Sequence, residues 1–214
     1  MRVEEFLAER DHVLVAFDGP IAELPPAGSV ADRLRVLVAE GGLSREVRRT
    51  DDPFEVLAHA AEIGPATARA VYAQLCRIEH ELVAFAEVAP GVRGALAAIT
   101  RAGTHITAVT GLDPEAARTF LVLHGLSDVV RHVVGRAGPD GAGLPPAPDL
   151  VALAVHERAF PVGSCAFVGG TGPDLAAARA AGVEALRYRR APDAADRVTP
   201  PNPWFDALSA PTKR

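Results

Sequence analysis

Short apolar runs alternate with amphipathic stretches of about ten residues along most of this sequence, a pattern that constrains the fold more than any single motif. The apolar runs predict strands at residues 13–17, 104–109, 129–134, 165–168 and 183–187. Strands that are connected through helices pair in parallel, with right-handed crossovers. The sequence therefore predicts an α/β fold built on a doubly wound, Rossmann-like parallel sheet.

One long helical block interrupts this alternation. Apolar spacing predicts helices from about residue 30 to Gly41, over 54–63 and over 66–86. We therefore expect an α/β core made of residues 1–25 and 89–190, with an all-helical cap at 26–88. The tail, 191–214, contains five prolines and no clear periodicity, although Trp204, Phe205 and Leu208 could attach it to the core.

Composition excludes several classes of protein. With 49% hydrophobic residues, the 214-residue chain can bury a sizeable core. A net charge of −5 argues against nucleic acid as a partner, because such proteins carry a basic surface. The sequence has no apolar run long enough to cross a membrane, and its first residues do not resemble a signal peptide. We expect a cytoplasmic protein without a membrane partner.

The first strand ends in Asp18, followed by the turn residues Gly19 and Pro20. Ligands of open α/β sheets bind beyond the carboxyl ends of the strands, so Asp18 occupies a position where chemistry is expected. This stretch resembles the first motif of the haloacid dehalogenase-like superfamily, Asp-x-Asp-Gly-Thr or Asp-x-Asp-Gly-Pro. The resemblance implies a nucleophilic first Asp and an acid/base second Asp. Here Ala16 stands at the nucleophile position and Asp18 at the acid/base position.

The later motifs of the superfamily are also recognisable, in order, up to about residue 190. Thr110 follows a strand and corresponds to the hydroxyl residue that binds the transferred phosphoryl group. The third motif is matched by Val134-Gly135-Arg136 and by Pro146-Ala147-Pro148, but Pro145 replaces its lysine. Gly169 to Asp174 resembles the fourth motif, with Gly170 in place of the first Asp.

Ala16, Pro145 and Gly170 thus remove the attacking carboxylate, the cation and one metal ligand that the resemblance implies. The only lysine of the chain is Lys213, so no other lysine near the site in sequence replaces the missing one, although Arg136 could supply a charge. Mg²⁺ requires hard oxygen ligands, of which Asp174 and a main-chain oxygen near Asp18 remain. We expect no metal and no cofactor.

Several residues remain candidates for the site. Asp18 and Thr110 are the expected catalytic residues, and Asp18 could equally serve only to hydrogen-bond its own turn. Asp174 could serve only the first turn of its helix. The expected substrate-binding residues are Gly19, His80, Gly111, Arg136, Thr171, Gly172 and Asp174.

Three functions remain open. The first is a repurposed, metal-independent enzyme that performs acid/base, cyclisation or rearrangement chemistry on a small organic molecule in specialised biosynthesis. The second is a pseudoenzyme that binds a metabolite or a protein partner. The third is a residual haloacid dehalogenase-like hydrolase. We expect a small-molecule ligand beneath the cap and consider a homodimer possible.

Overall fold

The central sheet contains six strands among the residues that the computed structural model describes, which are 2–25, 30–39, 42–189 and 202–209. Their order is β5-β4-β1-β6-β7-β8. Parallel pairing joins β1 (His12–Ala16), β4 (His105–Val109), β5 (His132–Val134), β6 (Cys165–Gly169) and β7 (Glu184–Tyr188). The expected doubly wound parallel sheet is therefore confirmed.

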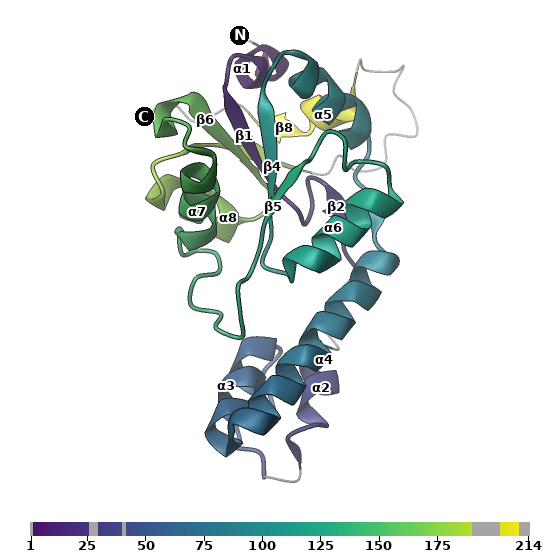
Figure 1. The fold of residues 1–214 in the computed structure, drawn as a ribbon, viewed down its shortest axis with the longest axis vertical. Helices are drawn as coiled ribbons and strands as arrows, with labels where there is room; N and C mark the ends of the chain where they lie inside the picture. Colours follow the sequence, from purple (N-terminus) through teal and green to yellow (C-terminus); the bar gives the residue numbers. More distant parts are fainter. Residues whose placement is uncertain (1, 26–29, 40–41, 190–201, 210–214) are drawn as a thin grey trace.

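Helices cover both faces of this sheet (Figure 1). One face carries α1 (Val3–Ala8), α5 (Val92–Arg101) and α6 (Pro114–Leu123), and the other carries α7 (Asp149–Arg158) and α8 (Gly172–Ala180). Side chains of a strand alternate between faces. Val13 and Val15 accordingly join the first apolar cluster, whereas Leu14 and Ala16 join the second. The alternation places the Ala16 methyl on the same side as α7 and α8.

The strand expected at 129–134 is shorter in the structure, where β5 contains only His132–Val134. The backbone N–H groups of Val129 and Val130 donate to the carbonyl of Leu126, which forms a turn. Val130 is buried in the core even though it belongs to no strand. An apolar run thus predicted burial correctly and its local structure incorrectly.

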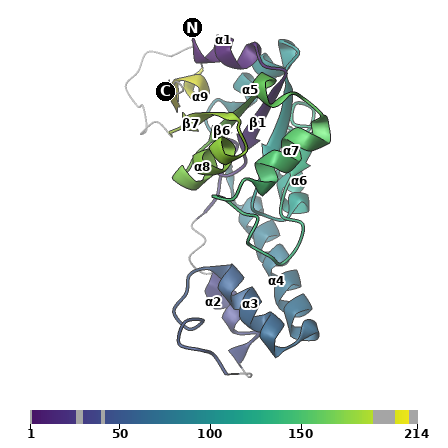
Figure 2. The ribbon, with the colours of Figure 1, turned by 90° about the vertical axis from the view of Figure 1, so that its left-hand side faces the viewer.

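The cap is a separate helical layer beyond the carboxyl ends of the strands (Figure 2). It contains α2 (Val30–Arg35), α3 (Pro53–Ile63) and α4 (Pro65–Ala84), whose apolar side chains form their own cluster. The helix expected to reach Gly41 ends as α2 at Arg35, and Gly41 itself lies outside the described residues. At the two connections to the core, β2 (Ala22–Glu23) pairs antiparallel with β3 (Glu87–Val88).

A buried ion pair joins the cap to the core. Arg136, which follows β5, donates from Nη1 to Glu79 Oε1 of α4 at 2.7 Å and from Nη2 to Oε2 at 3.0 Å. Arg136 also donates to the carbonyl of Gly111 at 2.7 Å, and Glu79 accepts the N–H of Asp113 at 2.9 Å. The cap is therefore hydrogen-bonded directly to the loops that follow β4 and β5.

The C-terminal segment returns to the core. Trp204, in α9 (Pro203–Asp206), is fully buried and donates its indole N–H to the carbonyl of Pro20 at 2.8 Å. Leu208 is also buried, in β8 (Leu208–Ser209), which pairs antiparallel with β7. Phe205 packs against the same core cluster, so the expected attachment through Trp204, Phe205 and Leu208 is confirmed. Residues 191–201 and 210–214 of the tail lie outside the described residues.

None of the helices among the described residues has the length and the continuous apolar character needed to span a membrane.

Candidate active site

The carboxyl ends of β1 and β4 border a cavity of about 240 Å³. Its lining comes from these strand ends, from the 135–147 loop and from the start of α8: Ala16, Phe17, Asp18, Leu24, Val109, Thr110, Gly111, Leu112, Leu144, Pro145, Thr171 and Asp174. A second cavity of about 290 Å³ shares Asp18, Leu24 and Thr171 with it and adds Gly19 and Gly170. We refer to the two together as the carboxyl-end site.

Ala16 is the last residue of β1 and is only 5% exposed. Ala16 pairs with Val109 of the parallel strand β4. The preceding residue, Val15, pairs with Val168 of β6 on the other side. This central position fixes its backbone rigidly between two neighbouring strands. Ala16 therefore presents a methyl group to the cavity, at the position where the family resemblance implies an attacking carboxylate.

Asp18 lies in the turn that follows β1. Gly19 adopts a φ of +90° and donates its N–H to the carbonyl of Ala22 at 2.8 Å, so the chain reverses immediately after Asp18. Loss of hydration raises the pKa of the Asp18 carboxyl group; hydrogen bonds from the backbone of Leu24 and Gly19 oppose this shift, and the charge of Asp174 adds to it. Asp18 remains in contact with solvent, and its carboxyl group can exchange protons.

Thr110 and Gly111 follow β4 and face the same cavity. The Thr110 hydroxyl oxygen accepts the N–H of Leu112 at 3.1 Å, which fixes the side chain against its own loop. A hydroxyl that accepts in this way still has its proton to donate. Thr110 can therefore orient an acceptor atom of a bound molecule.

Thr171 and Asp174 form a reciprocal cap at the start of α8. The N–H of Thr171 donates to Asp174 Oδ2 at 2.9 Å, and the N–H of Asp174 donates to the Thr171 hydroxyl at 3.2 Å. Such a capping box stabilises a helix without any ligand. Gly172, in the first turn of α8, lines neither cavity.

The donor set of the carboxyl-end site does not fit Mg²⁺. A Cβ atom at Gly170 would lie 3.3 Å from the carbonyl oxygen of Asp18, so this position is close to that oxygen, but glycine supplies no side-chain ligand there. Ala16 contributes no oxygen, and one carboxylate oxygen of Asp174 already accepts the Thr171 N–H. Mg²⁺ prefers several hard oxygen ligands in octahedral geometry, and this set is too small.

The structure does not bring His80 or Arg136 to the carboxyl-end site, although both were expected to bind the substrate. The His80 ring is hydrogen-bonded to the carbonyl of Cys76 within α4, and His80 lines neither cavity. Arg136 is 3% exposed, and its charge is matched by Glu79. The expectation that Arg136 replaces the missing lysine is therefore corrected, because its guanidinium group is hydrogen-bonded to Glu79 of the cap and to the carbonyl of Gly111.

The ionisable groups that line the two cavities are consequently unusual for an anion site. Asp18, Glu23, Asp174 and Tyr188 belong to the lining, and no lysine, arginine or histidine of the described chain does. Pro145 lines the first cavity at the position where the family resemblance implies a lysine. The site offers carboxylates and hydroxyl groups, which favour a neutral or cationic ligand over an anionic one.

Sequence reasoning missed the apolar walls of the site. Leu24, Leu112 and Leu144 come from three separate loops, and each lines the first cavity. None of them belongs to a motif, and an isolated leucine in a loop carries no signal that it faces a ligand. Their proximity follows only from the tertiary structure.

The fold defines a class of α/β proteins with a doubly wound parallel sheet and an inserted layer of helices. The family model for haloacid dehalogenase-like hydrolases matches residues 3–182 of the chain. The chain belongs to the haloacid dehalogenase-like hydrolase family. No curated protein matches the sequence.

Solved structures share the fold at low sequence identity. Mutant CbbY from Rhodobacter sphaeroides, in complex with xylulose-(1,5)bisphosphate, has 20% identity and a TM-score of 0.60, over 84% of this chain and 86% of that chain. A predicted phosphoglycolate phosphatase from Haemophilus somnus has 15% identity and a TM-score of 0.58, over 83% and 84% of the two chains. A HAD family hydrolase from Deinococcus radiodurans with bound phosphate and sodium has 22% identity and a TM-score of 0.51, over 83% and 80%. These similarities establish the fold alone.

Proposed function

We propose that the carboxyl-end site performs acid/base chemistry on a small organic molecule, through Asp18 and without a bound metal. One observation carries the proposal: among the described residues, the lining combines the carboxyl groups of Asp18 and Asp174 with no cationic side chain. A site that traps a phosphoryl group needs positive charge or donors to stabilise the developing negative charge. The lining of the carboxyl-end site instead favours a neutral or cationic ligand.

Phosphoryl transfer to the protein also requires a nucleophile. The side chain of Ala16 has no lone pair, and it occupies the rigid end of the central strand. The neighbouring carboxylates, Asp18 and Asp174, repel a phosphate dianion at short range. We therefore propose that this member of the family does not use the phosphatase chemistry named for several of its structural neighbours.

Asp18 and Thr110 can supply the proposed chemistry. The raised pKa of Asp18 brings its carboxyl group closer to the range in which it can both donate and accept a proton. The Thr110 hydroxyl can orient a substrate oxygen, and the walls formed by Leu24, Leu112 and Leu144 exclude water from one side. Cyclisation, rearrangement and elimination reactions need positioning of the substrate and a group that removes a proton from one atom and returns it to another atom or to the leaving group, and one carboxyl group can do both.

A non-catalytic binding function is the second candidate, and specific contacts favour it. Asp18 accepts hydrogen bonds from the backbone of its own turn, at Gly19 and Leu24. Thr171 and Asp174 cap α8 reciprocally. Each of these residues therefore has a structural reason to be present, and the same cavity could hold a metabolite without changing it.

The first experiment tests the loss of phosphatase chemistry. Wild-type protein is assayed with p-nitrophenyl phosphate over a titration of MgCl₂, beside Ala16→Asp and its matched control Ala16→Asn. We expect no magnesium-dependent turnover in any of the three, because Ala16→Asp restores neither a cation nor a ligand at Gly170. Magnesium-dependent turnover by the wild-type protein would instead support the residual hydrolase.

The second experiment separates catalysis from binding. The protein is incubated with a metabolite extract, and mass spectrometry follows the compounds that disappear, for wild type, Asp18→Asn and the exposed-loop control Asp140→Asn. Consumption that is lost only in Asp18→Asn supports the enzyme. Compounds that are retained by the wild-type protein and by Asp18→Asn but never consumed support the binding function and contradict the proposed chemistry.

A further inference from the structure

A larger cavity, of about 490 Å³, lies at the opposite end of the sheet from the candidate active site. Three segments line it: the end of α5 with the start of β4 (100, 103–106), the approach to β5 (128, 129, 131, 132) and Arg158 at the end of α7. We call it the amino-end cavity. His105 and Val109 are the two ends of β4, so about 13 Å of strand separates this cavity from the carboxyl-end site. Its volume suits a small metabolite.

The lining of the amino-end cavity is rich in basic side chains. His105, Arg131, His132 and Arg158 all contribute to it, against a single carboxylate, that of Asp128. Burial, followed by the neighbouring charges of Arg158, His105 and His132, lowers the pKa of the buried His12 to about 4. The low pKa agrees with a positive potential at this end of the sheet.

The two arginines of the cavity lack carboxylate partners among the described residues. Arg131 donates its Nε to the carbonyl of Asp128 at 3.1 Å, which leaves its terminal guanidinium nitrogens without a protein acceptor in that part of the chain. Arg158 approaches only His105 Nδ1, at 3.4 Å. Both guanidinium groups therefore retain donors for a ligand.

Packing and hydrogen bonds hold the cavity in shape. The His105 ring lies 5.1 Å from the ring of Phe160, and the Thr104 hydroxyl donates to the carbonyl of Arg10 at 2.8 Å. His132 Nε2 is hydrogen-bonded to Glu157 Oε2 at 2.6 Å, so the carboxylate of Glu157 already has a partner. Of the basic residues, His105 and His132 lie on strands β4 and β5, whereas Arg131 directly precedes β5 and Arg158 is the last residue of α7.

We propose that the amino-end cavity binds a small phosphorylated metabolite, whose phosphate group is held between Arg131 and Arg158. Guanidinium groups present paired N–H donors that match phosphate oxygens, and charge-assisted bonds of this type are about twice as strong as neutral ones. The net charge of −5 disfavours a polyanion such as nucleic acid, whereas a small dianion experiences mainly the local arginines. This site is independent of the proposed acid/base chemistry.

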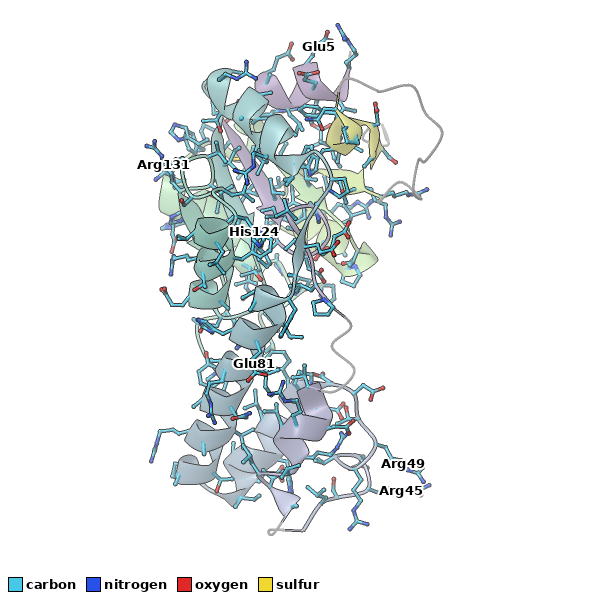
Figure 3. The ribbon with its side chains drawn as sticks, turned by 90° about the vertical axis from the view of Figure 1, so that its right-hand side faces the viewer. Glu5, Arg45, Arg49, Glu81, His124 and Arg131 are labelled. Atoms are coloured by element: carbon cyan, nitrogen blue, oxygen red, sulfur yellow. The ribbon has the colours of Figure 1, made fainter. Side chains whose placement is uncertain are left out.

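The test measures binding of inorganic pyrophosphate by isothermal titration calorimetry. We compare wild type with Arg131→Ala, Arg158→Ala and the control Arg49→Ala, which removes the same charge from the far end of the cap (Figure 3). Each cavity variant should weaken binding about tenfold or more, because one charge-assisted contact is lost. The control should change it less than about twofold, because Arg49 is remote and surface charge is screened. Equal weakening by Arg49→Ala, or no binding by the wild type, would overturn the proposal.

Backbone amide shifts locate the bound pyrophosphate. We expect the amides of Gly103 and Asp128 to move during the titration, whereas those of Gly111 and Thr171 stay in place. Shifts confined to Gly111 and Thr171 would overturn the amino-end proposal and would also count against the proposed function, because they would place an oxyanion in the carboxyl-end site. Shifts at neither end would overturn the amino-end proposal alone.

Discussion

The two ends of the central sheet differ in charge in a way that reverses the expectation from the family. At the carboxyl end, Asp18 and Asp174 line the cavities and no described cation does, whereas Arg131 and Arg158 line the cavity at the amino end. The backbone of the fold is common to both ends. The difference shows that one sheet presents linings of opposite charge at its two ends, because the side chains and not the backbone set that charge.

The difference in charge between the two ends depends on how the charge of Arg136 is paired. Its guanidinium group is bonded to the carbonyl of Gly111 in the loop that follows β4, and its charge is paired with the Glu79 carboxylate. Glu79→Gln should lower the free energy of unfolding by about 3 to 5 kcal/mol, because it leaves a buried arginine without its counter-charge. Urea denaturation measures this loss.

Glu81→Gln is the matched control, because Glu81 lies on the same helix and pairs with Arg33 at the surface (Figure 3). An exposed ion pair contributes about 1 kcal/mol or less, so this variant should be nearly neutral. If Glu79→Gln costs no more than Glu81→Gln, the buried pair does not hold the cap to the core.

The amino end can be tested through His12, which is fully buried in β1 and bonded to the Thr107 hydroxyl at 2.8 Å. Its folded-state pKa of about 4 lies below the ordinary value of 6.5, so the unfolded state takes up a proton first as the pH falls. The contribution of the neutral His12 ring to the free energy of unfolding is complete above pH 6.5. About 3 kcal/mol of this free energy is lost as the pH falls from 6.5 through 4.

The free energy of unfolding should therefore fall more between pH 7.5 and pH 4.5 for the wild type than for His12→Gln. The exposed His156 supplies the matched control variant, His156→Gln. The groups that face His12 are Arg158 on α7, His105 on β4, His132 on β5 and the Cys165 thiol on β6. Equal slopes for wild type and His12→Gln would contradict the low pKa that burial, together with the neighbouring positive charges, gives to the His12 ring.

A smaller effect is expected at Thr171, which belongs to the carboxyl-end site. Thr171→Ala removes the capping hydroxyl of α8 and should cost about 1 kcal/mol, measured by thermal unfolding. Thr119→Ala, on the exposed side of α6, removes a hydroxyl that bonds only within its helix, to the carbonyl of Glu115, and should cost less. A neutral Thr171→Ala variant would contradict the capping role that we assign to this hydroxyl.

Local patterns predicted the elements well. The helix expected over 54–63 is α3, which covers Pro53–Ile63, and the apolar run before Asp18 is the central strand. Both features depend on periodicity and on turn residues that lie next to each other in the sequence. The short β8 was not predicted, because two residues carry no periodicity and their pairing with β7 is a long-range contact.

The sites were predicted less completely, for a physical reason. Motif order located Asp18, Thr110 and Thr171 together, because the carboxyl ends of parallel strands share one edge. It misplaced Arg136, whose partner Glu79 lies on the cap, far along the chain. The amino-end cavity was missed because its basic residues come from separate segments and none belongs to a motif.

Paramagnetic relaxation by Mn²⁺, used in place of Mg²⁺, tests the central claim most directly. In ¹⁵N-labelled protein, micromolar Mn²⁺ should broaden the amides of Gly19 and Gly170 no more than those of other exposed loops, because the site lacks enough oxygen ligands. Selective broadening of Gly19 and Gly170 that excess Mg²⁺ reverses would contradict the account.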